Sequence, residues 1–333
     1  MLKAAAATGR FQIRAVADQD RQKAEKTAAE LGCEAYSDYR QLIVQNQLDC
    51  LLVAAETHTC DEQLKAAMKR KFNILKLPPP GRTFEEALEY VQLAESEKVR
   101  FAVANTARFR SSYATAHDLI SQGLIEQVFL IAACGTMGAA DRPAWQTDPK
   151  LAGGGVLLHD CYQMVDQILR SFPIPEQVYA LAANQAPDKQ QRLYLTEDTA
   201  LVCMKFSEVL MGSLTVTRRN EIAPSGISLQ IHGKGARLTV TDRAVVLETH
   251  DGQGDRKWQY DEDEQVVTER LLASFADSLR AGAEHEFPGG AADNLRNMAV
   301  FESAYLSART GFPEEPARIL QMAGNSAGAA TSI

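Results

Sequence analysis

The stretch AVADQDRQKAEKTAAELG, residues 15–32, joins the end of a β-rich run to a helix. The run covers residues 11–17, and residues 20–31 have the composition of a helix. Gly32 follows at the position where glycine commonly ends a helix. The stretch therefore predicts a strand that leads directly into a helix.

The same alternation of strand and helix continues downstream. Helical patterns alternate with apolar runs at residues 38–46, 49–55, 59–70, 72–75, 83–97 and 100–104. Thr83 and Glu86 match a capping box at the start of the fifth of these segments. Alternating units of this length are typical of an α/β protein with a doubly wound parallel sheet. We therefore expect a first domain of this class at residues 1–105.

After Asn105 the pattern changes from alternation to a predominance of strands. Short β-rich segments with glycine turns occupy residues 128–134, 178–183, 199–206, 210–217, 228–233 and 236–241. Helices are expected mainly at residues 113–122, 156–171, 264–281 and 292–310. This order predicts a second domain, residues 106–333, of the α+β type with an open, mainly antiparallel sheet and helices on one face.

Composition excludes several classes of protein. The 333 residues are 45% hydrophobic and 23% charged, which is ordinary for a globular chain long enough for two domains. The net charge of -8, with both signs interspersed, provides no basic face for nucleic acid. No apolar run approaches the roughly 20 residues of a membrane helix, and no signal peptide is evident. We expect a cytoplasmic protein with no nucleic-acid or membrane partner.

The six cysteines are scattered and contain no C-x-x-C pair, so reduced thiols are expected. The spacings His58-x-Cys60 and His159-x-Cys161 invite a metal interpretation. Alternate residues of a strand point to opposite faces, and structural zinc sites favour tighter cysteine pairs. No metal site is predicted.

The N-terminal region lacks a feature of dinucleotide-binding sheets. Such sheets usually begin with a strand, a G-x-G-x-x-G turn and a helix, and this turn occurs nowhere in the sequence. Residues 1–8 resemble the latter part of a helix that ends at Gly9, so the chain is expected to begin inside the first βαβ unit.

Asp18 ends the first predicted strand. An acid there accepts hydrogen bonds from both ribose hydroxyls of adenosine and repels a 2′-phosphate, which favours NAD over NADP. The equally supported alternative is that Asp18 or Asp20 caps the following helix.

The order of segments resembles the glucose-fructose oxidoreductase, inositol dehydrogenase and rhizopine-catabolism (Gfo/Idh/MocA) family from about residue 1 to residue 315. The resemblance is carried by AVADQDRQKAEKTAAELG (15–32), LLVAAETHT (51–59), ARFRSSY (107–113), WQTDPKLAGGGVLLHDCYQMVD (145–166), EDTALVCMKF (197–206) and ESAYLSARTG (302–311). It implies a Rossmann-like domain, here without its first strand and glycine loop, and a C-terminal domain whose open sheet often forms a dimer interface. It also implies NAD(P)-dependent oxidation or reduction of a sugar, polyol or similar hydroxyl compound.

The family's Glu-Lys-Pro motif, whose lysine supports the catalytic base, falls on Leu77, Pro78 and Pro79. The lysine position is therefore Pro78, which has neither charge nor donor. Lys76 lies two residues earlier, and residues i and i+2 of a strand share a face, so its ammonium is a candidate replacement. The alternative is a solvated or snorkelling lysine.

The family's triple glycine is followed by an acid, a histidine four residues later and an acid three residues further on. These positions are His159, Gln163 and Asp166 here. Glutamine cannot act as a base, so the resemblance leaves His159, beside Asp160, as a relocated catalytic base. The alternative is a histidine that only hydrogen-bonds in the cleft.

The remaining positions carried over from the family concern the cofactor and the substrate. Glu56, Thr57, His58 and Asn105 are expected to bind the cofactor. Arg108, Trp145, Asp160 and Asp166 are expected to bind the substrate. Helix capping by His58 and a surface ion pair of Arg108 are the alternatives. The glycines 153–155 either admit a ligand close to the backbone or permit a tight turn.

These observations support an NAD(P)-dependent oxidoreductase that acts on a sugar or polyol and forms homo-oligomers through its C-terminal sheet. The combined loss of the lysine and the histidine supports a second interpretation, a catalytically inactive relative that binds a sugar or nucleotide as a sensor or scaffold. An interaction protein without a ligand is the third.

Overall fold

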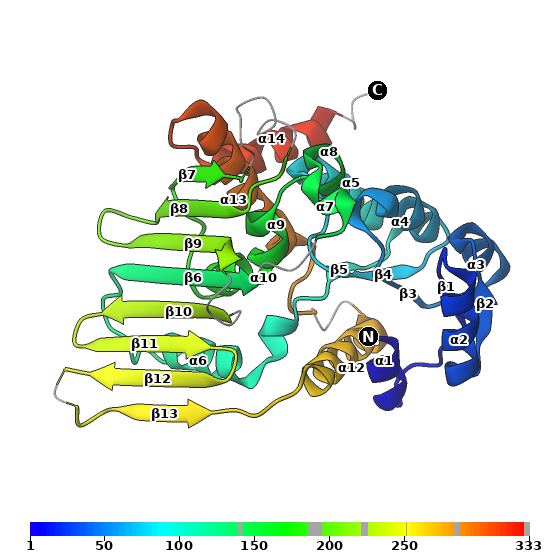
Figure 1. Cartoon of the computed structure of the whole chain (residues 1–333), viewed down its shortest axis with the longest axis horizontal. Helices are drawn as coiled ribbons and strands as arrows, with labels where there is room; N and C mark the ends of the chain where they lie inside the picture. Colours follow the sequence, from blue (N-terminus) through cyan, green and yellow to red (C-terminus); the bar gives the residue numbers. More distant parts are fainter. Residues whose placement is uncertain (139–141, 186–194, 221–225, 251, 283–286, 330–333) are drawn as a thin grey trace. The chain divides into compact units, whose positions relative to one another are not determined.

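The computed structural model describes residues 1–138, 142–185, 195–220, 226–250, 252–282 and 287–329 (Figure 1). The chain divides into two compact units. Unit 1 contains Met1–Leu77, Glu89–Phe109 and Glu262–Ala291, and unit 2 contains Pro78–Leu88, Arg110–Asp261 and Ala292–Ile333. The units are discontinuous along the chain, whereas the proposed domains 1–105 and 106–333 are continuous segments.

Unit 1 is built from short parallel strands and helices. Its elements are α1 (Leu2–Ala7), β1 (Ala15–Ala17), α2 (Arg21–Leu31), β2 (Glu34–Tyr36), α3 (Tyr39–Gln45), β3 (Cys50–Val53), η1 (Thr57–Thr59), α4 (Cys60–Lys69), β4 (Asn73–Lys76), the latter part of α5 (Phe84–Glu97), β5 (Phe101–Val103), η2 (Thr106–Phe109) and α12 (Glu264–Ala281). The expected strand at residues 11–17 is limited to its last three residues, and β2 was not predicted.

The strands of unit 1 form two parallel pieces, β1-β2 and β3-β4-β5. The two pieces correspond to strands 2-3 and 4-5-6 on either side of the first strand of a doubly wound sheet. Within the described residues, no strand pairs with both β1 and β3. Helices α1 and α12 pack on β4 and β5 through a buried cluster that includes Ala5, Leu75, Ala102, Leu271 and Phe275. The predicted parallel α/β class is confirmed for this unit.

Capping groups mark both ends of helix α2 and the start of helix α5. The Asp20 carboxylate accepts hydrogen bonds from the first turn of α2, and Gly32 ends that helix with a left-handed φ of 68°. The backbone N–H of Glu86 donates to Thr83 Oγ1 at 3.3 Å. The Glu86 carboxylate accepts from the Arg82 N–H at 2.8 Å, so the predicted capping box is displaced by one residue.

Unit 2 contains the larger sheet. Its elements are the start of α5, α6 (Ser111–Ser121), β6 (Leu130–Gly138), α7 (Ala144–Thr147), α8 (Pro149–Ala152), α9 (Val156–Asp160), α10 (Tyr162–Ser171), β7 (Gln177–Ala183), β8 (Thr199–Lys205), β9 (Met211–Asn220), β10 (Gly226–Gly233), β11 (Ala236–Thr241), β12 (Ala244–Thr249), β13 (Arg256–Gln259), α13 (Ala291–Thr310) and α14 (Pro316–Ala329).

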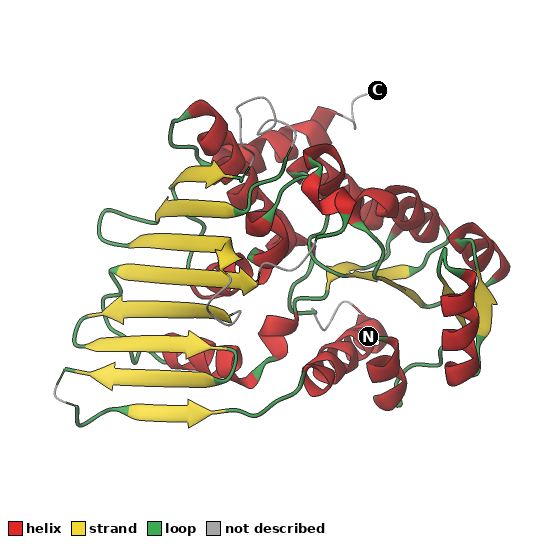
Figure 2. Cartoon of the chain, viewed as in Figure 1, coloured by secondary structure: helices red, strands yellow, loops and turns green. Residues whose placement is uncertain are grey.

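The eight strands lie in the order β13-β12-β11-β10-β6-β9-β8-β7. Only the β6–β9 pair is parallel, so the predicted mainly antiparallel sheet is confirmed. Helices cover one face of this sheet (Figure 2). Alternation along β8 buries Ala200, Val202 and Met204 and leaves Leu201 and Cys203 exposed. Strands β12 and β13 were not predicted.

One helix prediction was wrong in a way that matters for the site. Residues 156–171 were expected to form one helix, but Cys161 (φ -103°, ψ 2°) separates α9 from α10. None of the described helices has the length and apolarity needed to span a bilayer.

Candidate functional site

The triple glycine of unit 2 is required by close packing of the chain on itself. A Cβ atom on Gly154 would lie 2.0 Å from the Tyr305 hydroxyl oxygen, and one on Gly155 would lie 1.9 Å from the Glu197 carbonyl oxygen. Gly153 has a φ of 78°, and a Cβ there would lie 2.1 Å from the Arg82 carbonyl. The tight turn, rather than the approach of a ligand, therefore accounts for these glycines.

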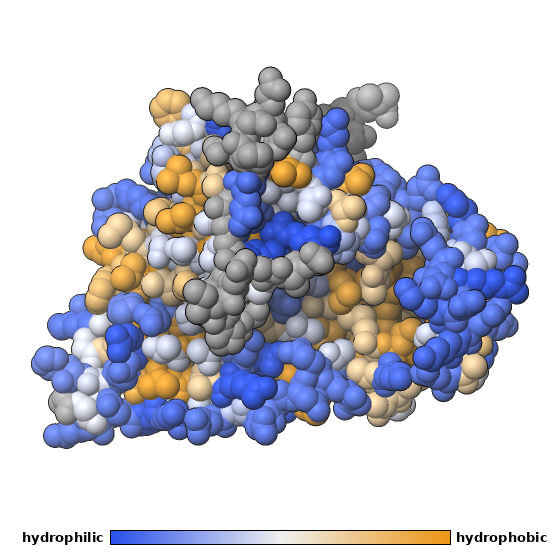
Figure 3. Space-filling model, viewed as in Figure 1, coloured by the Kyte–Doolittle hydropathy of each residue, from blue (hydrophilic) through white to orange (hydrophobic). Residues whose placement is uncertain are grey.

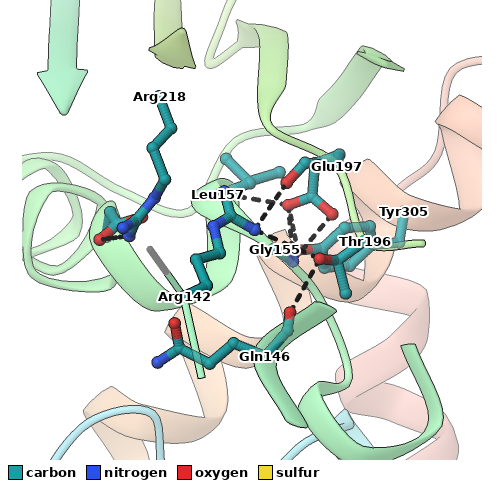
Figure 4. Close-up of polar contacts among 9 residues, drawn as sticks. Arg142, Gln146, Gly155, Leu157, Thr196, Glu197, Arg218 and Tyr305 are labelled. Atoms are coloured by element: carbon teal, nitrogen blue, oxygen red, sulfur yellow. Dashed lines mark hydrogen bonds and ion pairs between the residues drawn. The ribbon is translucent and has the colours of Figure 1, made fainter. Parts of the chain in front are cut away.

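Glu197 holds this turn at the start of α9 (Figure 4). The Gly155 N–H donates to the two carboxylate oxygens of Glu197 at 2.9 and 2.8 Å, and the Leu157 N–H donates to Glu197 Oε1 at 3.0 Å. The Tyr305 hydroxyl donates to the same oxygen at 3.0 Å. Burial raises the pKa of Glu197, while these hydrogen bonds act in the opposite direction. Sequence reasoning missed Glu197, because burial of a charged residue leaves no local pattern.

His159 lies in α9 and is oriented by two neighbours. Its Nε2 is 3.0 Å from the Ala152 carbonyl oxygen, and its ring meets Trp145 edge-on at a centroid distance of 5.5 Å. A carbonyl oxygen can only accept, so Nε2 carries the hydrogen, and in the neutral ring the lone pair lies on Nδ1. The structure thus brings together two residues that the sequence had singled out separately.

Two arginines, which sequence reasoning did not identify, surround the end of α9. Arg218 forms an ion pair with Asp160 through Nη2. Arg142 donates from Nη1 to Thr196 Oγ1 at 3.3 Å and to the Glu197 carbonyl at 3.5 Å. Burial and the nearby charge of Arg218 lower the pKa of Arg142. Asp160 is therefore part of a charged cluster rather than an isolated acid.

Gln163 and Asp166 belong to α10, not to the helix of His159. The single helix expected over residues 156–171 is interrupted at Cys161, so His159 does not share a helix with Gln163 and Asp166. Asp166 is fully buried and accepts a hydrogen bond from Asn297 Nδ2 at 2.8 Å. This bond ties α10 to α13.

In unit 1, Asp18 stands at the end of β1 with an exposed side chain. Its Oδ1 accepts from the Asp20 N–H at 2.9 Å, whereas Asp20 itself caps α2 by accepting from Gln22 and Lys23. The ribose-binding and helix-capping alternatives thus apply to two different residues. Asp20 is the helix cap, and the Asp18 carboxylate remains at the surface.

The residues after β3 form the 3-10 turn η1. Thr57 is buried, and His58 Nε2 lies 3.6 Å from a carboxylate oxygen of Glu56. Thr59, not His58, occupies the N-cap position of α4, so the alternative of capping by His58 was wrong. Lys76 is 2% exposed and donates to the Leu77 carbonyl at 3.1 Å. It is therefore neither solvated nor snorkelling.

Asn105 and Arg108 follow β5 and meet at Gly289. A Cβ on Gly289, whose φ is 91°, would lie 3.4 Å from Asn105 Nδ2 and 3.8 Å from Arg108 Nε. Arg108 is buried, which excludes the surface ion pair considered as its alternative. Asn105 is fully buried, and neither of its side-chain polar atoms has a hydrogen-bond partner among the described residues.

Across the described ranges, no group of three or more His, Cys, Asp or Glu side chains is arranged to hold a metal ion. The cis peptide bond that the proline run permits lies between Pro78 and Pro79.

Two family models match the chain. Residues 1–105 match the model described as oxidoreductase family, NAD-binding Rossmann fold, and residues 113–239 match the GFO/IDH/MocA C-terminal domain. The chain therefore belongs to the Gfo/Idh/MocA family of oxidoreductases. The predicted family and cofactor class are confirmed, because the N-terminal match is to an NAD-binding Rossmann domain.

Among curated proteins, the chain is similar to the 2,7-anhydro-N-acetylneuraminate hydratase of Escherichia coli strain K12. Identity is 25% over 174 residues, which cover 50% of this chain and 45% of the hydratase. The dTDP-3,4-didehydro-2,6-dideoxy-alpha-D-glucose 3-reductase of Streptomyces antibioticus is also 25% identical, over 43% of this chain and 44% of the reductase. The chain thus spans less than half the length of these curated relatives.

Solved structures share the fold over most of the chain. A levoglucosan dehydrogenase in complex with NADH and levoglucosan superposes with a TM-score of 0.82 at 17% identity and covers 94% of both chains. An inositol dehydrogenase homolog complexed with NAD+ from Azotobacter vinelandii gives a TM-score of 0.80 at 19% identity, with 90% and 88% coverage.

Proposed function

We propose that this protein is an NAD-dependent oxidoreductase that oxidises or reduces a hydroxyl carbon of a sugar or polyol. The observation that carries the proposal is the hydrogen bond from His159 Nε2 to the Ala152 carbonyl at 3.0 Å. It fixes the tautomer of an imidazole in the second domain of a chain whose first domain is of the NAD-binding family.

Two features of unit 1 fit the dinucleotide. The exposed Asp18 carboxylate at the end of β1 suits the adenosine ribose and disfavours a 2′-phosphate. The amide of Asn105, at the carboxyl end of β5, has no partner in the described part of the chain and offers both a donor and an acceptor where open sheets bind ligands. Glu56, Thr57 and His58 follow β3 at the corresponding place. The sequence has no G-x-G-x-x-G, so we assign no residue to the diphosphate.

When bound, NAD supplies the hydride acceptor. The contribution of the chain is proton transfer, for which His159 Nδ1 would accept the hydroxyl proton while Ala152 and Trp145 hold the ring. Gln163 cannot replace it, because an amide does not titrate near neutral pH. The family's lysine position is Pro78 in this chain. We assign the supporting charge of that lysine to Lys76, which is buried and donates to the Leu77 carbonyl.

The substrate class is supported by the named relatives. Their names refer to levoglucosan, inositol and a dTDP-linked sugar, all of which are sugars, polyols or sugar derivatives. Trp145, Arg108 and Asp160 are assigned to substrate binding. Asp166 accepts a hydrogen bond from Asn297, so we assign it to holding α10 against α13 instead.

The test is turnover of a panel of sugars and polyols with NAD, monitored by NADH absorbance, for the wild type and His159→Ala. Loss of activity with an unchanged Kd for NADH supports the assignment of His159. Turnover by His159→Ala at the wild-type rate would contradict the assignment of His159 as the base.

A catalytically inactive relative is the second candidate, favoured by Pro78 and Gln163 at the family's catalytic positions. Saturable binding of NADH, without turnover of any member of the panel, would identify it. Failure to bind NADH would contradict the oxidoreductase and leave the inactive relative only as a sugar-binding protein.

We also propose that the open face of the unit 2 sheet joins two copies of the chain. Tyr179, Leu181, Leu201 and Met211 on β7, β8 and β9 are 37%, 56%, 47% and 59% exposed. Figure 3 shows apolar residues among polar ones over this sheet. A self-complementary contact would bury them. Leu201→Lys should dissociate the oligomer in light-scattering chromatography, whereas Val44→Lys, at a 69% exposed site of unit 1, should not.

A further inference from the structure

Two buried guanidinium nitrogens of unit 2 have no hydrogen-bond partner among the described residues. They are Nη2 of Arg142 and Nε of Arg218. Arginine remains protonated in proteins, so neither side chain can relieve this by losing its charge. A buried donor without an acceptor destabilises a fold, and a charged one does so more strongly. The pair therefore requires an explanation beyond packing.

Both arginines are anchored to the same part of the unit. Arg142 Nη1 donates to Thr196 and to the Glu197 carbonyl, and the backbone N–H of Arg218 donates to the Asp198 carbonyl at 2.8 Å. The charge of Arg218 contributes to lowering the pKa of Arg142, so the two groups are within electrostatic reach of each other. Figure 4 shows the Arg142 side chain pointing toward the turn at Gly155, with the Arg218 side chain on the side of Arg142 away from that turn.

Arg142 has no direct ion-pair partner among the described residues, although the nearby charges of Asp160, Glu197 and Asp198 act to raise its pKa. Asp160 is paired with Arg218, whereas Arg142 contacts only a hydroxyl and a carbonyl in the described part of the chain. The unused donors are thus the two N–H groups of Arg142 Nη2 and the single N–H of Arg218 Nε. Two guanidinium nitrogens can each donate a charge-assisted hydrogen bond to one oxygen of a carboxylate. Asp160, the ion-pair partner of Arg218, is also the sequence neighbour of His159.

We infer that Arg142 and Arg218 form a carboxylate-binding subsite, and that the ligand of this protein is an acidic sugar of the aldonic or uronic type. The carboxylate would accept from Arg142 Nη2 and Arg218 Nε, and a hydroxyl carbon of the same molecule would face His159. This inference deepens the proposed function and rests on it for the chemistry at the hydroxyl.

Matched pairs of ligands test the subsite through binding rather than activity. D-Gluconate is compared with D-glucitol, and D-glucuronate and D-galacturonate with D-glucose and D-galactose, by calorimetric titration of the full chain with and without NADH. D-Glucose 6-phosphate tests whether the subsite binds a phosphate in place of a carboxylate. At least one acid should bind at least about tenfold more tightly than its neutral partner, a difference of about 1.4 kcal/mol, and more tightly than the phosphate.

Arg142→Gln is the informative variant, because Arg142 forms no ion pair with any residue that the structure describes. It should abolish the preference for the acid and leave the Kd of the neutral ligand and of NADH unchanged. Arg237→Gln, which removes an exposed arginine of β11 paired with Glu248 of β12, is the matched control and should keep the preference.

The outcomes separate this inference from the proposed function. Absence of any preference for an acid, a preference for the phosphate, or a preference that survives Arg142→Gln overturns the carboxylate subsite even if NADH binds. A preference that Arg142→Gln removes supports the subsite even if NADH fails to bind, in which case only the proposed oxidoreductase is lost.

Discussion

The hydroxyl of Tyr305 donates to Oε1 of Glu197 at 3.0 Å, which links α13 to the buried acid that caps α9. The same carboxylate receives the N–H groups of Gly155 and Leu157. Burial outweighs these bonds and raises the pKa of Glu197 above its ordinary value of 4.5. The orientation of His159, four residues after Gly155, therefore depends on a carboxyl group that titrates abnormally.

Glu197→Gln should change the pH dependence of folding stability. Above about pH 4.5 the unfolded chain loses the Glu197 proton while the folded chain keeps it. The stability that this proton contributes is thus present below pH 4.5 and is lost as pH rises through the folded pKa. Urea unfolding at a series of pH values should show the free-energy difference between wild type and variant falling with pH.

A difference that is constant or rises with pH would contradict this account of Glu197. Glu208→Gln is the control, and its stability difference should change with pH in the opposite direction, because Lys205 lowers the pKa of the exposed Glu208. Its smaller contribution should be present above the ordinary pKa of 4.5 and disappear as pH falls.

Gly155→Ala should destabilise unit 2 strongly. The added Cβ would lie 1.9 Å from a backbone carbonyl oxygen, which cannot rotate away as a side chain can. We expect a loss of about 3 kcal/mol or more of unfolding free energy, in the range of severe overpacking. Gly226→Ala, with no atom within 4 Å of the added carbon, should change stability by less than about 0.5 kcal/mol. Equal effects in thermal unfolding would show that the turn is not packed as described.

Asn105→Leu should separate stability from function. The buried amide has no hydrogen-bond partner in the described ranges, and an unsatisfied polar group costs about 1–3 kcal/mol. An apolar side chain of similar size should therefore leave the ligand-free chain equally stable or more stable, while weakening binding of NADH. A clear loss of stability in chemical denaturation would mean that the amide has a structural partner.

The sequence predicted many of the elements but not their tertiary partners. Periodicity and caps predicted α2, α12 and the strands β7–β11 closely, because those signals are local. The strands β2, β12 and β13 were missed, since they are short or polar and are defined by pairing with a neighbour.

The site shows the same limit. His159, Trp145 and Asp160 were identified from a motif, whereas Arg142, Arg218 and Glu197 were not, because they gather at α9 from segments far apart in the sequence. The interruption at Cys161 also escaped prediction, since residues 156–171 have a continuous helical pattern.

The most direct test of the central claim is the affinity of the full chain for NADH, measured by the change in NADH fluorescence for wild type, Asp18→Asn and Glu30→Gln. Both substitutions neutralise one exposed carboxylate of unit 1, but Glu30 lies in α2 and forms a surface ion pair with Lys3. We expect saturable binding that Asp18→Asn weakens at least about tenfold, or 1.4 kcal/mol, and that Glu30→Gln leaves unchanged. No saturable binding by the wild type, or equal binding by all three proteins, would contradict the account.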